Sequence, residues 1–177
     1  MVKMKDYRSI MALTALVLMA LFSTIGCSKM PTANDDPATT TLLKRNLSAL
    51  KVTDAVAHID TVLNAAEGGV VTLLDVELDF PPKALPNDTL ISIDIPDLAV
   101  FANDFGTNGL IFNVPVRVTM SYRDADLSGL DETTIKMAWY NPHSGNWDII
   151  DCHINPLDMT VTAFVSHFSA YALITDE

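Results

Sequence analysis

The region from residue 52 to residue 177 consists of short runs in which apolar and polar residues alternate. The runs at 76–80 (VELDF) and 91–95 (ISIDI) have the period of two that places successive side chains on opposite faces of a β-strand. No long stretch has the helical period. Further strands are expected at 57–64, 70–73, 110–112, 116–122, 134–140, 147–151, 159–165 and 167–174. This pattern predicts an all-β fold, a sandwich or a barrel, and the region is long enough for one core and therefore one domain.

The first 27 residues contain the three parts of a secretory signal. Basic residues at positions 3, 5 and 8 precede an apolar run over 10–25, which leads into Gly26 and Cys27. This run is shorter than the ~20 residues that cross a bilayer core, which disfavours an uncleaved membrane helix. The segment resembles a bacterial lipoprotein signal, which implies cleavage between Gly26 and Cys27 and a diacylglycerol on the Cys27 thiol. We therefore expect lipid anchoring in the cell envelope, at the outer membrane.

Residues 27–51 begin with many Ser, Thr, Pro, Asn and Asp residues and predict a lipidated tether with a short ordered piece at 42–50. Removing residues 1–26 deletes three basic side chains and one acidic one, so the formal net charge changes from −11 to −13. Such a surface repels nucleic acid, which excludes nucleic-acid partners. The expected partners are the membrane, through the lipid, and a protein or other envelope component.

Lipidation of Cys27 would leave Cys152 as a single thiol, and an internal disulfide is then excluded. Isoleucines on both sides of Cys152 indicate a strand and a buried, inert thiol. His153 is next in sequence, but successive strand residues point to opposite faces, so we expect no Cys–His pair. Trp139 and Trp147 flank a turn at 141–146, and core packing is favoured over a carbohydrate-binding platform.

Four motifs in a fixed order carry a family resemblance. They are Gly68-Gly-Val-Val-Thr-Leu73, Phe80-Pro-Pro-Lys-Ala-Leu85, Gly109-Leu-Ile-Phe-Asn-Val-Pro-Val116 and Ser166-His-Phe-Ser-Ala-Tyr-Ala-Leu173. Over residues 57–177 the chain resembles the ZU-five domain of ankyrins, netrin receptors and tight-junction scaffolds, and its relatives on bacterial lipid-anchored proteins. It departs from the family at Lys83, where the family usually has Gly. The resemblance implies a single antiparallel β-sandwich that acts as a non-enzymatic interaction or structural module.

The resemblance also implies one chemical alternative, self-cleavage at a His-Phe-Ser triplet, which corresponds here to His167, Phe168 and Ser169. The Ser169 hydroxyl would attack the Phe168 carbonyl carbon, His167 would accept the hydroxyl proton, and the resulting ester would be hydrolysed. This reaction requires strain at the scissile peptide bond. The simpler interpretation is a strand in which Phe168 points inward and the two polar residues point outward.

The acidic loop at 124–132 is the other candidate site. Asp124, Asp126 and Ser128 alternate like the first ligands of a calcium loop, and Asp131 follows. Position twelve would be Ile135 in place of the required Glu, so a turn between strands is the favoured interpretation. No other catalytic motif or metal-ligand spacing is found. We therefore expect no cofactor beyond the lipid on Cys27, with a calcium- or glycan-binding module as the remaining alternative.

Overall fold

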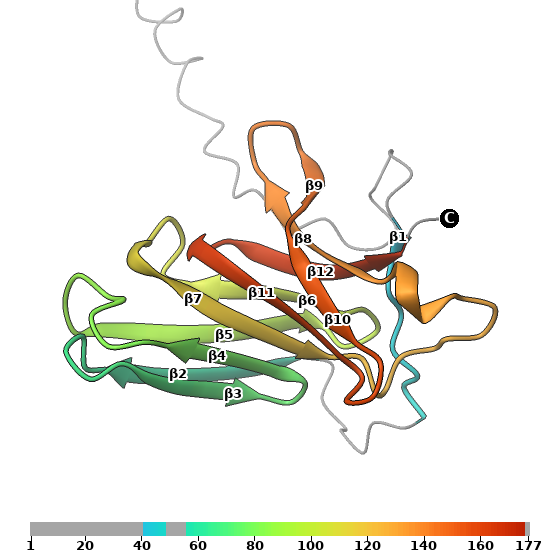
Figure 1. Cartoon of the computed structure of the whole chain (residues 1–177), viewed down its shortest axis with the longest axis horizontal. Coiled ribbons are helices and arrows are strands. Elements are labelled where there is room, and N and C mark those ends of the chain that lie inside the picture. The colour runs from blue at the N-terminus through green and yellow to red at the C-terminus, as the bar shows by residue number, and fades with distance from the viewer. Residues whose placement is uncertain (1–40, 49–55, 176–177) are drawn as a thin grey trace, which may run out of the picture.

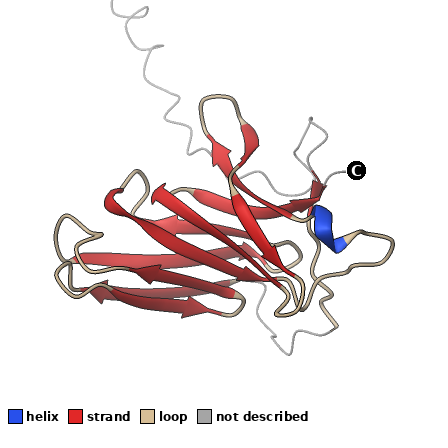
Figure 2. Cartoon of the chain, in the orientation of Figure 1, coloured by secondary structure: helices blue, strands red, loops and turns tan. Residues whose placement is uncertain are grey.

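A computed structural model describes residues 41–48 and 56–175, which form two antiparallel β-sheets packed face to face (Figures 1 and 2). The larger sheet has the order β2-β5-β6-β12-β8-β9, and β1 pairs with the end of β12. Its strands are β1 (Thr41–Leu42), β2 (Ala57–Leu63), β5 (Thr89–Asp97), β6 (Ala102–Gly106), β8 (Lys136–Asn141), β9 (Asn146–Ile149) and β12 (Ala170–Thr175). This architecture confirms the predicted all-β sandwich.

The smaller sheet has five strands in the order β10-β11-β7-β4-β3. These are β3 (Gly69–Leu73), β4 (Val76–Phe80), β7 (Ile111–Ser121), β10 (Cys152–Asn155) and β11 (Thr160–His167). In the described residues a short 3-10 helix, Glu132–Thr134, is the one helical element. No helix among these residues has the length and apolarity needed to span a membrane.

The space between the sheets is filled by inward-facing residues of alternating strands, with an aromatic cluster at one end. The Phe168 ring lies edge-on to Phe112 and Phe80, with ring centroids 4.9 and 5.9 Å apart. Phe105 completes the group and stacks on Tyr171 at 5.5 Å. Edge-to-face aromatic packing of this kind stabilises a core beyond the area it buries.

Strand β12 is buried on both faces, which explains its continuous apolar sequence AYALIT. Tyr171 and Leu173 point into the core between the sheets. Ala170, Ala172 and Ile174 belong to a second apolar cluster together with Leu42, Val100, Ala102, Ala138 and Trp147.

Glycine and proline shape the turns around β3 and β4. Gly68 has a φ of +71°, and a Cβ there would lie 2.1 Å from the Phe80 carbonyl oxygen, so only glycine fits. Strand β4 ends at Phe80, directly before Pro81, which has no N–H to donate to a ladder. Lys83 has a φ of +67°, a left-handed conformation that favours glycine.

Two strand predictions are wrong in detail, and one strand is missed. Pro115 does not divide two strands, because β7 continues from Ile111 to Ser121. The ladder opposite Pro115 is irregular between Val165 and His167, so the missing N–H of proline costs no pairing. Strand β6 was not predicted, since ANDFG lacks a clear alternation. The expected strand at 167–174 begins only at Ala170.

The ordered piece predicted within the tether is part of the sandwich. Leu42 pairs with Ile174 of β12, and the Leu43 amide donates to the Leu173 carbonyl at 2.9 Å. The Leu43 side chain is 1% exposed and belongs to the main core. Residues 41–46 are therefore held by both backbone hydrogen bonds and side-chain burial.

Candidate functional site

The His-Phe-Ser triplet lies where the chain crosses from the smaller sheet to the larger one. His167 ends β11, and Phe168 and Ser169 connect it to β12. Phe168 points inward, as predicted, and is 2% exposed. The backbone of these two residues leaves the regular ladder, since the Phe168 amide donates to the Leu110 carbonyl and the Phe105 amide donates to the Ser169 carbonyl. The prediction of a simple strand through the triplet is therefore wrong.

A cavity of about 370 Å³ lies beside this crossing. Its lining combines aromatic and apolar side chains with four polar ones: Asp104, Asn108, Gly109, Trp139, Tyr140, Pro142, His167, Phe168, Ser169 and Ala170. A cleft of this size with a few polar groups converging on an apolar wall has the general form of a small-molecule or side-chain binding site. It is the candidate functional site.

The triplet has some but not all of the geometry that self-cleavage needs. The Phe168 carbonyl oxygen accepts a hydrogen bond from the Gly109 amide at 3.3 Å and lies 3.3 Å from His167 Nδ1. Both contacts would polarise the carbonyl toward attack. However, the Ser169 hydroxyl donates to the Tyr140 carbonyl oxygen at 3.2 Å, so its proton is directed away from His167. None of the three residues has a positive φ.

Asp104 is the carboxylate of the cavity. Burial raises its pKa, the nearby charge of Asp94 raises it further, and a hydrogen bond from Asn108 opposes the shift. One carboxylate oxygen, Oδ1, is buried and has no hydrogen-bond partner. Burying an ionised oxygen without a hydrogen bond costs free energy. Asp104 is therefore a candidate for binding a ligand that would supply the missing hydrogen bond.

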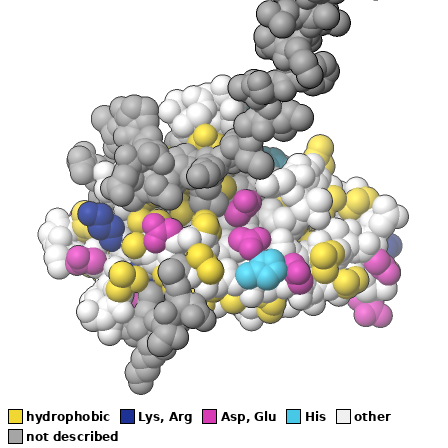
Figure 3. Space-filling view, turned by 180° about the vertical axis from the view of Figure 1, so that it is seen from behind, with side chains coloured by type: hydrophobic (Ala, Val, Ile, Leu, Met, Phe, Trp, Pro, Cys, Tyr) yellow, Lys and Arg dark blue, Asp and Glu magenta, His cyan; other side chains and the backbone are white. Residues whose placement is uncertain are grey.

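Asp104 belongs to a polar row across the outer face of the larger sheet, formed by the cross-strand partners His58, Asp94 and Asp104. His58 contacts Asp94 at 2.5 Å and Asp60 at 3.2 Å, and these hydrogen bonds raise the pKa of its imidazole. The face turned away from the viewer in Figure 1 shows acidic side chains beside a histidine (Figure 3). Asp94 therefore has a cationic partner in this row when His58 is protonated.

The carboxylates of the acidic loop act as turn acceptors. Asp126 Oδ1 accepts from the Ser128 amide at 3.1 Å, and Asp131 Oδ1 accepts from the Thr133 amide at 3.0 Å. Hydrogen bonds from Ser128 and Thr133 lower the pKa of Asp126 and Asp131, respectively. Asp124 contributes its backbone carbonyl to the Asn46 amide. In residues 41–48 and 56–175 no three His, Cys, Asp or Glu side chains are grouped as a metal site.

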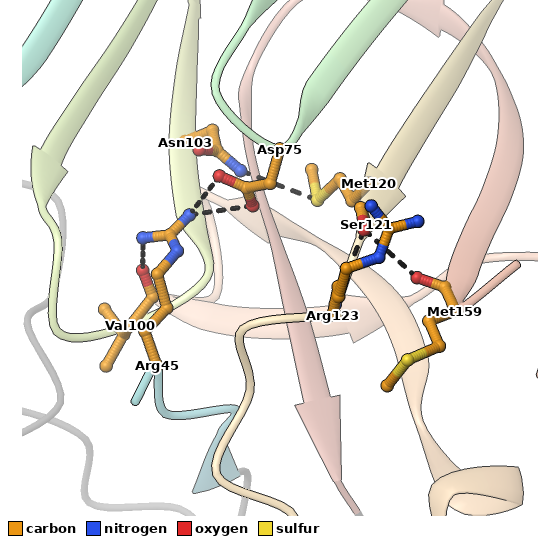
Figure 4. Close-up of polar contacts among 8 residues, drawn as sticks. All are labelled: Arg45, Asp75, Val100, Asn103, Met120, Ser121, Arg123 and Met159. Atoms are coloured by element: carbon orange, nitrogen blue, oxygen red, sulfur yellow. Dashed lines mark hydrogen bonds and ion pairs between the residues drawn. The ribbon is translucent and has the colours of Figure 1, made fainter. Parts of the chain in front are cut away.

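A buried ion pair that sequence reasoning missed joins the two sheets (Figure 4). Arg45 Nη2 lies 2.9 Å from both carboxylate oxygens of Asp75, in the turn between β3 and β4. Arg45 Nη1 donates to the Val100 carbonyl, and the guanidinium lies 4.2 Å from the centre of the Phe101 ring. The side chains of Arg45 and Asp75 are 1% and 13% exposed. A basic residue among apolar ones in a supposed tether, LLKRNL, was the signal available in the sequence.

Burial raises the pKa of Asp75, while Arg45 acts in the opposite direction. Arg45 therefore offsets part of the cost of burying this carboxylate. The contacts of this cluster fasten the N-terminal segment to the sandwich. Its role is structural.

The other residues singled out from the sequence do not form a common site. The Cys152 sulfur is partly buried and accepts from the Met137 amide at 3.3 Å, which fits an inert thiol. Trp147 is buried in the second apolar cluster, whereas Trp139 lines the cavity, edge-on to His167 at 5.1 Å. Gly26 and Cys27 lie outside the described residues.

A scan against protein-family models finds no match to this chain, and a search of curated proteins finds none either.

Proposed function

We propose that this protein is a lipid-anchored component of the cell envelope whose β-sandwich presents a non-catalytic interaction surface. The anchor rests on the signal-like segment that ends in Cys27. The interaction surface rests on one observation, the exposed apolar side chains on the outer face of the smaller sheet. Ile111 and Phe164 are 72% and 69% exposed, although both lie within strands.

The backbone alternation places Ile111, Pro115 and Phe164 on the same face of β7 and β11, since Phe112 and Val116 point into the core. Phe164 pairs across the ladder with Arg117, which contacts Asp79 at 2.7 Å. An exposed aromatic residue with an adjacent polar rim is typical of protein interaction sites. A solvated sheet face would favour polar residues at these positions.

The anchor is tested by Cys27→Ala in the full-length chain. The wild-type protein should sediment with membranes and carry the mass of an acylated cysteine. The variant should lack that mass and move to the soluble fraction. A variant that stays in the membrane fraction would contradict lipid anchoring through this residue.

The surface is tested by chemical cross-linking in intact cells, which should give a discrete higher-mass species. Phe164→Ser and Ile111→Ser should each reduce that species about tenfold, because an exposed apolar anchor is lost. Leu157→Ser is the matched control, since Leu157 is 94% exposed in a turn but outside this face. Retention of the species in the Phe164 variant would contradict the proposed surface.

Self-cleavage between Phe168 and Ser169 is the second candidate, favoured by the Gly109 amide and His167 beside the Phe168 carbonyl. It predicts a C-terminal fragment that starts at Ser169 in a denaturing gel and in intact-mass measurement. Ser169→Ala should abolish that fragment, and a single full-length species in the wild-type protein would rule the reaction out.

A further inference from the structure

The cavity at the β11–β12 crossing contains an acidic group with no compensating charge. In the row His58, Asp94 and Asp104, the imidazole of His58 lies 2.5 Å from Asp94 but has no recorded contact with Asp104. Asp94 and Asp104 are directly opposite each other on adjacent strands, an arrangement that is unfavourable for two like charges. A cation beside Asp104 would relieve this repulsion.

The cavity itself supplies no such cation. No lysine or arginine lines it, and Asn108 is the neutral residue that bonds to Asp104. His167 also lines the cavity, but its Nδ1 is directed to the Phe168 carbonyl oxygen. Asp104 Oδ1 has no hydrogen-bond partner. An external donor with a positive charge would complete this site.

The rest of the lining suits an apolar stem attached to that positive charge. Tyr140 lies on the same face of the larger sheet as Ala170 and Asp104 and contributes an aromatic ring. Trp139 lines the cavity from the opposite face of β8, and Pro142 extends the apolar wall. Aromatic faces attract ammonium and guanidinium groups, and the attraction grows where water is partly excluded. A divalent metal ion suits this cavity less well than an organic cation does. Among the described residues, no three His, Cys, Asp or Glu side chains come together here as metal ligands.

We propose that this cavity binds an organic cation, an ammonium or guanidinium group on an apolar stem, with Asp104 as the anionic anchor and Tyr140 as the aromatic wall on the same sheet face. A lysine or arginine side chain of another protein and a free alkylamine share this chemistry. The inference rests on the cavity alone and does not depend on the anchor or on the surface around Phe164.

The test is an NMR titration of the full mature chain with n-butylammonium, n-butylguanidinium and the neutral analogue 1-pentanol, at constant ionic strength and near neutral pH. Both cations should give saturable shifts at Asn108, Gly109, Ala170 and the Trp139 indole. Each should bind about tenfold more tightly than 1-pentanol, because only the cations interact with the carboxylate. Equal binding of the three probes, or shifts away from the cavity, would overturn the proposal.

Two variants identify the anchor. Asp104→Asn keeps the side-chain shape and should weaken both cations about tenfold, with little effect on 1-pentanol. Glu67→Gln is the matched control, because it removes one negative charge at an exposed position outside the cavity, and it should leave binding unchanged. A dispersed amide spectrum shows that each variant is folded. Unchanged cation binding in a folded Asp104→Asn protein would overturn the proposal.

A third variant tests the aromatic wall. Tyr140→Leu retains apolar volume against Trp147 but removes the ring, so it should weaken the cations more than 1-pentanol. Comparison of Nα-acetyl-lysine methylamide with n-butylammonium then separates the two sources. If the lysine derivative binds as tightly as n-butylammonium, the ligand is a protein side chain. If the lysine derivative binds about tenfold more weakly, the ligand is a free amine.

Discussion

Arg45 is the residue on which the attachment of the N-terminal segment depends most. Its guanidinium is almost completely buried, and Asp75 is the one anion that contacts it in the described part of the chain. Removing one partner of such a pair leaves an uncompensated buried charge, which costs far more than the pair itself contributes. Arg45 also bridges the sheets, since it belongs to the segment beside β12 and bonds to the β3–β4 turn.

Arg45→Met and Asp75→Asn should therefore each lower the free energy of unfolding by about 3–5 kcal/mol. The double variant should lose clearly less than the sum of the two, because neither charge is then left buried alone. Urea unfolding of the four proteins measures the coupling. Strictly additive losses would show that the two side chains do not form an energetically coupled pair.

Asp104 gives a prediction for the dependence of stability on pH. Burial and Asp94 raise its pKa above the ordinary value of 3.8, so the folded protein binds this proton more tightly than the unfolded chain does. The stabilisation that comes from protonated Asp104 is fully present below pH 3.8, the ordinary pKa of this group. It is lost as the pH rises through the raised pKa of the folded protein. Asp104→Asn removes this loss, so the variant should match wild type near pH 3.8 and exceed it by about 0.5 kcal/mol near neutral pH. Urea unfolding at several pH values measures the difference in stability between variant and wild type, and a difference that shrinks as the pH rises would contradict this prediction.

Lys83 occupies a left-handed turn in which a side chain is unfavourable. Lys83→Gly should raise the free energy of unfolding by about 0.5–1 kcal/mol, measured by urea unfolding. Lys136→Gly is the control within strand β8, where glycine should lower stability. The family resemblance, which expects glycine at position 83, would also be consistent with a gain here.

At the level of elements, the sequence was informative where one face of a strand is solvated. Strands β4 and β5 were predicted because Val76–Phe80 and Ile91–Ile95 alternate, and in the structure both runs alternate between buried and half-buried residues. Strand β6 was missed because Ala102 and Asn103 are both buried, which removes the alternation. The break at Phe168 and Ser169 depends on bonds to Leu110 and Phe105 in other elements, which a local pattern cannot show.

The candidate site was only partly predictable, because it too depends on contacts between elements that are far apart in the sequence. His167, Phe168 and Ser169 were identified from a motif, but Asp104 lies on β6, the strand that was missed. Trp139 packs against the main core, as expected, but its place in the cavity lining was not predicted. The convergence of β6, β8 and β12 is a property of the sheet order, which no local alternation specifies.

Strand β1 and the residues after it give a prediction at the same scale. Leu43 is 1% exposed and packs in the main core, whereas Leu47, four residues on, is 55% exposed. Leu43→Ala should lower the free energy of unfolding by about 2–5 kcal/mol, and Leu47→Ala should change it by less than about 0.5 kcal/mol. Urea unfolding of both variants tests whether the segment at 41–48 is part of the folded unit. Equal effects would contradict this.

For the whole molecule, the dominant electrostatic property is an excess of negative charge, −11 over the full sequence. Mutual repulsion among these charges destabilises the compact state, and added salt screens it. The buried Arg45–Asp75 pair is protected from such screening by its low exposure. Salt should therefore stabilise the fold, because it weakens the surface repulsion more than it weakens this internal pair.

Raising the NaCl concentration should increase Tm by about 2–4 °C, the shift that roughly 1 kcal/mol gives in a protein of this size. Calcium chloride at matched ionic strength should add no more than magnesium chloride does, because Asp126 and Asp131 already accept hydrogen bonds within their own turns. The double variant Asp124→Asn/Asp126→Asn serves as the control and should respond equally to both divalent salts. A rise specific to calcium that disappears in this variant would instead support a calcium-binding module at the 124–132 loop. Thermal melts monitored by circular dichroism distinguish the two outcomes, since general screening acts on both proteins alike and a specific site acts only on the wild type.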